Sequence, residues 1–167
     1  YRILNDIAWY KPNASPNLGR RMFTASHETL IWASKSKKAK HTFNYQLLRE
    51  GVFPSDRFKN PGRQMRSAWE TFDSRDSLWP ITTPRKYEKE FGKHPTQKPL
   101  ALVGRIVLSS TQEGDVVLDP FCGSGTTGVA SLENGREFIG IDSDRVFLRD
   151  LAKKRIKESC IAIQPRT

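Results

Sequence analysis

Two carboxylates bracket a glycine-rich turn between residues 116 and 142. The turn Gly123-Ser124-Gly125-Thr126-Thr127-Gly128 fits the pattern G-x-G-x-x-G, in which glycines let backbone N–H groups approach a ligand at the start of a helix. Asp119 ends the apolar run before the turn, and Asp142 ends the apolar run after it at the spacing of a ribose-binding acid. The pattern predicts a β-α-β unit that binds a nucleoside-type cofactor at the carboxyl ends of its strands.

The residues before the turn argue against a dinucleotide. Asp119-Pro120-Phe121 place a carboxylate and an aromatic ring at the end of the strand. A pyrophosphate would be repelled there, whereas a cofactor that carries an ammonium group would be favoured. Two alternatives stay open at this point: an NAD-binding oxidoreductase, and glycines that serve only close packing.

Apolar spacing predicts the elements that must position this turn. The runs around it read as strands buried on both faces of a parallel sheet. A helix is expected after Pro99, because Leu100, Val103, Ile106 and Val107 recur at helical spacing. Ser143 is the expected cap of a last helix. At the other end of the chain, residues 1–10 read as the end of a helix or turn and then a short buried strand, and residues 27–33 as another strand.

Length and composition point to one domain. A chain of 167 residues can form a single core, and 37% hydrophobic with 28% charged residues describes a soluble protein. No apolar run approaches the roughly 18 residues of a membrane span, and no signal peptide is visible. Cys122 and Cys160 lack the spacing of metal ligands or of a disulfide framework. We therefore expect a cytoplasmic protein with no membrane contact, no metal site and no catalytic cysteine.

The net charge of +10 lies almost entirely in the first half of the chain. Residues 1–93 contain 18 Lys and Arg against 9 Asp and Glu, whereas residues 94–167 contain 10 against 9. A basic half beside a nearly neutral half predicts that one part binds a polyanion such as nucleic acid while the other binds a small molecule. A solvated face explains the lysines at 35–40 equally well, but it does not explain the arginines elsewhere.

The basic half offers candidate contacts to nucleic acid. Lys11, Arg20 and Arg21 lie in a loop broken by two prolines, where they could contact phosphates. Residues 35–93 interleave aromatics such as Tyr45 with basic side chains, and we interpret them as an inserted recognition region. Gln64 and Arg66 carry the forked donors that can read base edges. Most of the aromatics could instead form a small local core.

Several motifs together resemble the permuted, beta-class DNA amino-methyltransferases of bacterial restriction-modification systems. They are W-Y-K-P-N-x-x-P-N, R-R-x-F-T-x-x-H-E-T-L-I-W-A, F-N-Y, Q-M-R-S-x-W, G-K-H-P-T-Q-K-P and D-P-F-C-G-S-G-T-T-G. The resemblance implies transfer of a methyl group from S-adenosylmethionine to an exocyclic amino group of a base flipped out of duplex DNA, most simply N6 of adenine, with N4 of cytosine as the alternative.

The resemblance also implies an architecture: an incomplete Rossmann-like α/β sheet of the S-adenosylmethionine-dependent methyltransferases, with an inserted target-recognition region. Within one methyltransferase domain of residues 1–167, residues 1–40 would be the last strands of the catalytic half. Residues 41–93 would be the target-recognition region and residues 94–167 the cofactor-binding region. Asp119 would face the methionine end and Asp142 the ribose. The other implied cofactor contacts are Thr96, Gln97, Lys98, Phe121, Gly123, Ser124, Gly125 and Thr126.

One motif of that family is absent. Its catalytic tetrapeptide, an Asp, Asn or Ser followed by two prolines and an aromatic, occurs nowhere in the 167 residues, so no catalytic residue is assigned. We expect the C-terminal part of an enzyme, inactive without an upstream segment or a separate chain that carries the tetrapeptide. There are two alternatives: a non-catalytic remnant that binds DNA or S-adenosylmethionine, or one half of a split enzyme. Whether the chain forms a homodimer stays open.

Overall fold

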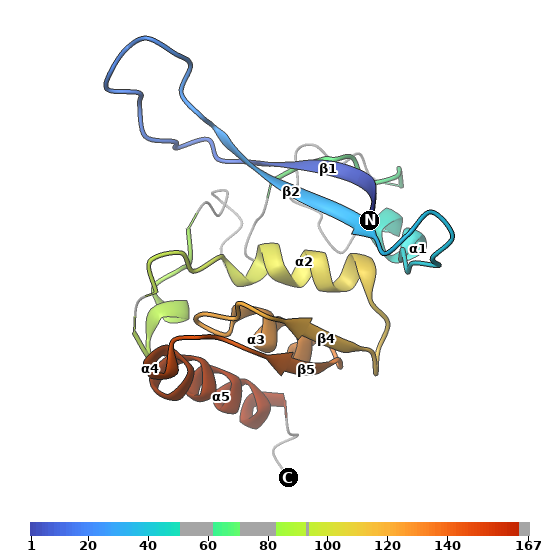
Figure 1. Ribbon diagram of the computed structural model, residues 1–167, viewed down its shortest axis with the longest axis vertical. Coiled ribbons are helices and arrows are strands. Elements are labelled where there is room, and N and C mark those ends of the chain that lie inside the picture. The colour runs from blue at the N-terminus through green and yellow to red at the C-terminus, as the bar shows by residue number, and fades with distance from the viewer. Residues whose placement is uncertain (51–61, 71–82, 93, 164–167) are drawn as a thin grey trace. The chain divides into compact units, whose positions relative to one another are not determined.

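The computed structural model describes residues 1–50, 62–70, 83–92 and 94–163 (Figure 1). The chain divides into two units, which we describe separately. The first unit comprises Tyr1–His41 and Tyr45–Thr82, and the second comprises Thr42–Asn44 and Thr83–Thr167. Within the predicted recognition region of residues 41–93, residues 51–61, 71–82 and 93 lie outside the described residues.

The first unit is built on a long antiparallel hairpin. Strands β1 (Arg2–Tyr10) and β2 (His27–Ser34) pair over their length, with an irregularity between Ile3 and Asn5. The short strand β3 (Ala68–Trp69) pairs in parallel with β1, and helix α1 spans Tyr45–Glu50. Arg2–Tyr10 thus form one continuous strand, and the expected helix or turn at the start of residues 1–10 is wrong. The prediction failed because apolar residues lie at both ends of this long strand, so its sequence resembles that of two separate short elements.

The second unit contains the predicted β-α-β arrangement. Strand β4 (Val116–Asp119) leads through the glycine turn into helix α3 (Thr126–Glu133), and strand β5 (Glu137–Gly140) then pairs in parallel with β4. Helix α2 (Leu100–Ser110) precedes β4 and packs on α3 through a core of Val103, Val107 and Ala130.

The last helical segment of the second unit also packs on α3. It begins as α4 (Arg145–Phe147), passes through the π-helical turn η2 (Leu148–Ala152) and continues as α5 (Lys153–Ile163). A 3₁₀ turn, η1 (Tyr87–Lys89), lies upstream of α2. Asp144, not Ser143, caps the last segment, because its Oδ1 accepts hydrogen bonds from the backbone of Val146 and Phe147. The expected Ser143 cap is therefore wrong by one residue.

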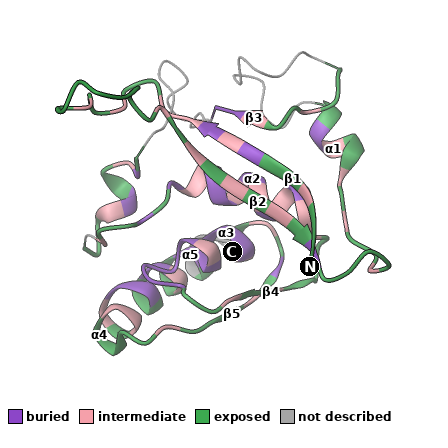
Figure 2. Ribbon diagram, turned by 45° about the horizontal axis from the view of Figure 1, so that its top comes forward, coloured by how far each residue is buried: buried purple, intermediate pink, exposed green. Residues whose placement is uncertain are grey.

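The strands of the second unit are buried on one face only. Phe138 packs towards α3, since a Cβ added at Gly128 would lie 2.7 Å from its ring. The opposite face is exposed: Val116, Leu118 and Ile139 keep 54%, 58% and 53% of their surface accessible (Figure 2). The prediction of strands buried on both faces is therefore wrong for this chain. Among the described residues, β4 pairs with no strand other than β5.

The described residues contain neither a membrane-spanning helix nor a cluster of metal-binding side chains. No helix there combines the length and the apolar character that crossing a bilayer requires. No group of three or more His, Cys, Asp or Glu side chains there is placed to hold a metal ion.

Candidate cofactor site

The glycine turn depends on left-handed backbone conformations. Gly123 has φ +47° and Gly125 has φ +75°, a region in which a side chain is strained. Space is also limited, because a Cβ added at Gly125 would lie 3.1 Å from Cα of Ala152. The turn is closed by the backbone N–H of Gly125, which donates to the carbonyl of Cys122 at 2.7 Å. The two glycines are therefore required by the path of the chain between β4 and α3.

Both predicted carboxylates lie at this turn and shape it. Asp142 accepts hydrogen bonds from the backbone N–H of Gly123 at 2.7 Å and of Asp144 at 2.9 Å. These two hydrogen bonds, of which the one from Asp144 has the larger effect, hold the pKa of the Asp142 carboxyl below its ordinary value. The group is therefore ionised at neutral pH. Asp119 accepts from the backbone N–H of Phe121 at 3.0 Å and from the Thr127 hydroxyl at 2.7 Å. The expected positions at the carboxyl ends of the strands are confirmed, whereas the ligand roles stay predictions.

His94 brings the segment of residues 94–98 to the same turn. A Cβ added at Gly123 would lie 3.2 Å from His94 Nε2, and the ring makes an edge contact with Phe147 at a centroid distance of 4.5 Å. The backbone N–H of Thr96 donates to His94 Nδ1 at 3.3 Å. Thr96 and Lys98 are exposed beside this contact. Sequence reasoning did not select His94, although it begins the H-P-T-Q-K-P motif.

Gln97 is the buried member of this segment, with 8% of its surface exposed. Its Nε2 donates to the carbonyl of Glu88 at 2.8 Å, and its Oε1 has no hydrogen-bond partner among the described residues. Glu88 in turn accepts from the backbone N–H of Leu100 at 2.7 Å and so satisfies the first turn of α2. A polar cofactor group that donates to Gln97 would remove the cost of its unpartnered oxygen.

A buried arginine supports the turn, and sequence reasoning missed it. Arg155 of α5 donates from one nitrogen to the carbonyl of Ser124 at 2.7 Å and to the Thr126 hydroxyl at 3.0 Å. Burial lowers the pKa of its guanidinium from the ordinary value. A signal was available in the spacing, since Arg155 follows Leu151 by four residues and so falls on the same face of the helix.

The remaining predicted contacts of the turn differ in exposure. The side chains of Ser124 and Thr126 are buried, with their hydroxyls 3.2 Å apart. Neither residue therefore presents an exposed hydroxyl to a ligand. Phe121, by contrast, is 85% exposed beside the carboxylates. Two carboxylates, an accessible aromatic ring and an unpartnered amide oxygen fit a cationic cofactor with a ribose, so the residues present fit S-adenosylmethionine.

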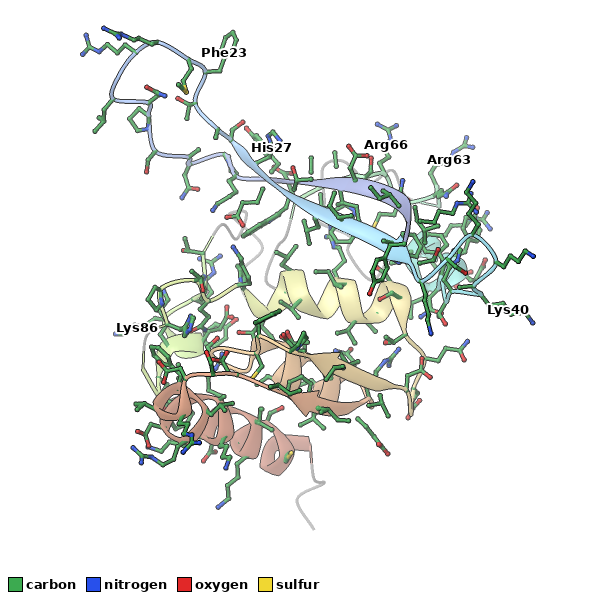
Figure 3. All side chains as sticks on the ribbon, in the orientation of Figure 1. Phe23, His27, Lys40, Arg63, Arg66 and Lys86 are labelled. Atoms are coloured by element: carbon green, nitrogen blue, oxygen red, sulfur yellow. The ribbon has the colours of Figure 1, made fainter. Side chains whose placement is uncertain are left out.

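All six predicted DNA contacts lie in the first unit. Lys11 forms an ion pair with Glu28 at 2.6 Å and lies 5.1 Å from the centre of the Trp9 ring, so it is held by its own unit. The other five, Arg20, Arg21, Tyr45, Gln64 and Arg66, are exposed. Figure 3 shows Arg63 and Arg66 projecting the same way from the ribbon. The DNA-binding roles of these residues stay predictions.

Comparison with known proteins gives a consistent family. The family described as DNA methylase, N6_N4_Mtase, matches residues 1–154. The chain is 47% identical to the type II methyltransferase M2.DpnII of Streptococcus pneumoniae over 94% of the chain and 52% of the relative. It is 42% identical to M.HinfI of Haemophilus influenzae over 93% of the chain and 40% of the relative. The chain thus spans about half the length of the curated relatives it matches.

Solved structures agree on the fold. The complex of M1.HpyAVI with SAM is 36% identical, with a TM-score of 0.64 over 92% of this chain and 62% of the other. The cytosine-N4-specific methyltransferase PvuII is 17% identical, with a TM-score of 0.60 over 94% of this chain and 55% of the other, and so shows a shared fold alone. The expected part of a Rossmann-like methyltransferase fold is confirmed.

Proposed function

Because the chain belongs to the DNA methylase family, we propose that it is the C-terminal, cofactor-binding part of an enzyme that methylates N6 of adenine in duplex DNA. S-adenosylmethionine supplies the electrophilic methyl group when it is bound. The observation that carries the proposal is the glycine turn between β4 and α3, with the carboxylates of Asp119 and Asp142 at the ends of the two strands. Family membership also removes the NAD-binding oxidoreductase as an alternative.

The residues of the turn have distinct roles in this proposal. Asp142 binds the ribose hydroxyls with the lone pairs that its two backbone donors leave free. Asp119 faces the ammonium group of the methionine end, where opposite charge favours binding. Phe121 offers an aromatic face to the cationic cofactor, and Gln97 accepts a hydrogen bond on its unpartnered Oε1. Arg155 holds the turn in place without touching the cofactor.

The first unit supplies the contact with DNA in this proposal. It is the basic part of the chain, and neutralised phosphates release counterions, so its arginines contribute affinity that salt weakens. Arg20 and Arg21 are assigned to phosphates, and Gln64 and Arg66 to base edges. Tyr45 is exposed at the start of α1, where its ring can stack on a base. Lys11 would first have to release Glu28, which makes it the weakest of these assignments.

A second polypeptide segment completes the enzyme in our proposal. Relatives about twice as long, and an apolar face of β4 and β5 open to solvent, support a partner segment that covers this face. The absent tetrapeptide would lie on that segment, which is either joined to this chain or a separate subunit. A homodimer is compatible with either arrangement.

Transfer of labelled methyl groups from S-adenosylmethionine to mixed-sequence duplex DNA tests the reaction. The 167-residue chain alone should transfer none, and transfer should appear when the tetrapeptide-bearing half of a relative is supplied. Digestion of the product to nucleosides should give N6-methyladenine. N4-methylcytosine would correct the target base. Transfer by the chain alone would contradict the proposed incompleteness.

A further inference from the structure

The connection between β1 and β2 is far longer than the hairpin needs. Tyr10 pairs with His27, and the backbone N–H of Lys11 donates to the carbonyl of Ser26 at 2.7 Å, so the strands are already closed where the loop begins. Sixteen residues, 11–26, then project as a loop (Figure 1). Hairpin loops usually have about two to five residues, and longer ones are commonly functional.

The tip of this loop exposes large apolar side chains. Leu18 is 91% exposed, Met22 is 72% exposed and Phe23 is 99% exposed. Figure 3 shows Phe23 on this projecting loop, beyond the end of β2. Three such side chains within six residues gain nothing from folding, because they stay in water. Their exposure is explained if a binding partner buries them.

The tip is held in shape by its own polar groups. The backbone N–H of Asn17 donates to the Thr24 hydroxyl at 3.4 Å, and the backbone N–H of Arg20 donates to the carbonyl of Asn17 at 3.1 Å. These bonds close residues 17–24 into a small lobe. The apolar side chains thus lie on a turn that has hydrogen bonds of its own.

The charge of the loop indicates the kind of partner. Residues 11–26 contain three basic residues and no acidic one, and Arg20 and Arg21 lie between Leu18 and Met22 in sequence. The partner must therefore offer negative charge and apolar surface within a few ångströms of each other. Duplex DNA does so, since phosphates border the stacked faces of its bases, and apolar wedges that enter base steps are a known mode of binding.

We propose that the lobe of residues 17–24 is a wedge that enters duplex DNA, with Phe23 and Met22 inserted at a base step and Arg20 and Arg21 on the adjoining phosphates. This inference rests on the proposed function, because it takes DNA as the partner. It adds a distortion of the duplex made by this chain itself. Such a distortion would lower the cost of taking the target base out of the stack.

Unwinding of closed circular DNA tests the wedge. Plasmid is relaxed by a topoisomerase with increasing amounts of the 167-residue chain, and the linking number is measured after the protein is removed. Wild-type chain should lower the linking number in proportion to the protein bound. Phe23→Ser should abolish this change and weaken duplex affinity about tenfold, a magnitude typical of lost aromatic–base stacking. Ile31→Thr is the matched control, because Ile31 is 58% exposed on β2 of the same unit.

The salt dependence of binding separates the two parts of the lobe. Replacing both Arg20 and Arg21 with Gln should flatten the dependence of affinity on salt, whereas Phe23→Ser should leave the slope unchanged. Wild-type binding without unwinding, or equal unwinding by Phe23→Ser, would overturn the wedge and leave the proposed function standing. A Phe23→Ser variant that loses only self-association would likewise assign the lobe to a protein interface. Failure of the wild-type chain to bind duplex DNA would overturn both proposals.

Discussion

Arg155 is a buried residue that supports the geometry of the turn. Its two hydrogen bonds reach Ser124 and Thr126 from α5, and only 7% of its surface is exposed. Arg155→Met keeps the aliphatic stem and removes the donors, so we expect a loss of about 2–3 kcal/mol in the free energy of unfolding, measured with urea. Lys154→Met, at the exposed neighbouring position, is the control. Equal stability of the two variants would contradict the supporting role of Arg155.

The two cysteines should differ in reactivity. Burial, and then the negative charges of Asp119 and Asp142, raise the pKa of the Cys122 thiol, so little thiolate is present at neutral pH. Cys160 is exposed on α5. We expect iodoacetamide to modify Cys160 well before Cys122, as followed by mass spectrometry of the native chain. Similar rates at the two sites would show that the turn opens readily.

Sequence reasoning found the carboxylates and glycines of the site because they are contiguous and have a recognisable spacing. It missed His94 and Arg155, since their contacts join segments distant in sequence. A histidine or arginine by itself fits many structural roles, and only the fold shows which surface it meets. The structure locates the residues assigned to the cofactor and to DNA, and their binding roles stay predictions.

At the scale of the elements, helix α2 ends on a cap supplied from another part of the chain. Asn44 donates from its amide nitrogen to the carbonyls of Leu108 and Thr111, both at 2.7 Å, and its backbone N–H donates to the carbonyl of Ser109 at 3.1 Å. Three carbonyls at the end of α2 are thereby satisfied by one residue. This explains why the short segment Thr42–Asn44 belongs to the second unit.

Removal of the Asn44 amide should therefore destabilise the second unit. We expect Asn44→Ala to lower its free energy of unfolding by about 1–3 kcal/mol, because two carbonyls lose a donor. Asn13→Ala, in the exposed loop of the first unit, should change stability by less than about 0.5 kcal/mol. Urea titration followed by circular dichroism measures both. An Asn44→Ala variant as stable as Asn13→Ala would show that the cap is dispensable.

The β-α-β unit was predictable because local signals agree there. Two apolar runs and the glycine turn between them mark its strands and the start of its helix, and the observed bounds follow them. The burial of its strands was not predictable in the same way. A continuous apolar run indicates that both faces of a strand can be buried. Whether they are buried depends on neighbouring elements elsewhere in the fold. The cap at Asp144 was missed for a simpler reason, since two adjacent residues can each cap a helix.

At the scale of the whole molecule, the open face of β4 and β5 should behave as a surface. Leu118 is 58% exposed in this chain, so Leu118→Thr should change the free energy of unfolding by less than about 0.5 kcal/mol. Leu102 is 2% exposed, and Leu102→Ala should cost about 2–5 kcal/mol. Thermal or urea unfolding of the isolated chain compares them.

The same face should become sensitive once its proposed partner segment is supplied. Leu118→Thr should then weaken association with the tetrapeptide-bearing half of a relative, because the side chain at position 118 would be buried in the complex. A large loss of stability in the isolated chain would instead show that the chain covers this face itself.

Binding of S-adenosylmethionine at the turn is the claim on which the account depends most, and titration calorimetry measures it directly. The wild-type chain should bind the cofactor, and Asp142→Asn should weaken binding about tenfold, as expected for a lost charge-assisted hydrogen bond. Glu137→Gln, an exposed change on β5, should bind normally. Circular dichroism would verify that each variant is folded. Normal binding by folded Asp142→Asn, or no binding by the wild-type chain, would contradict the account.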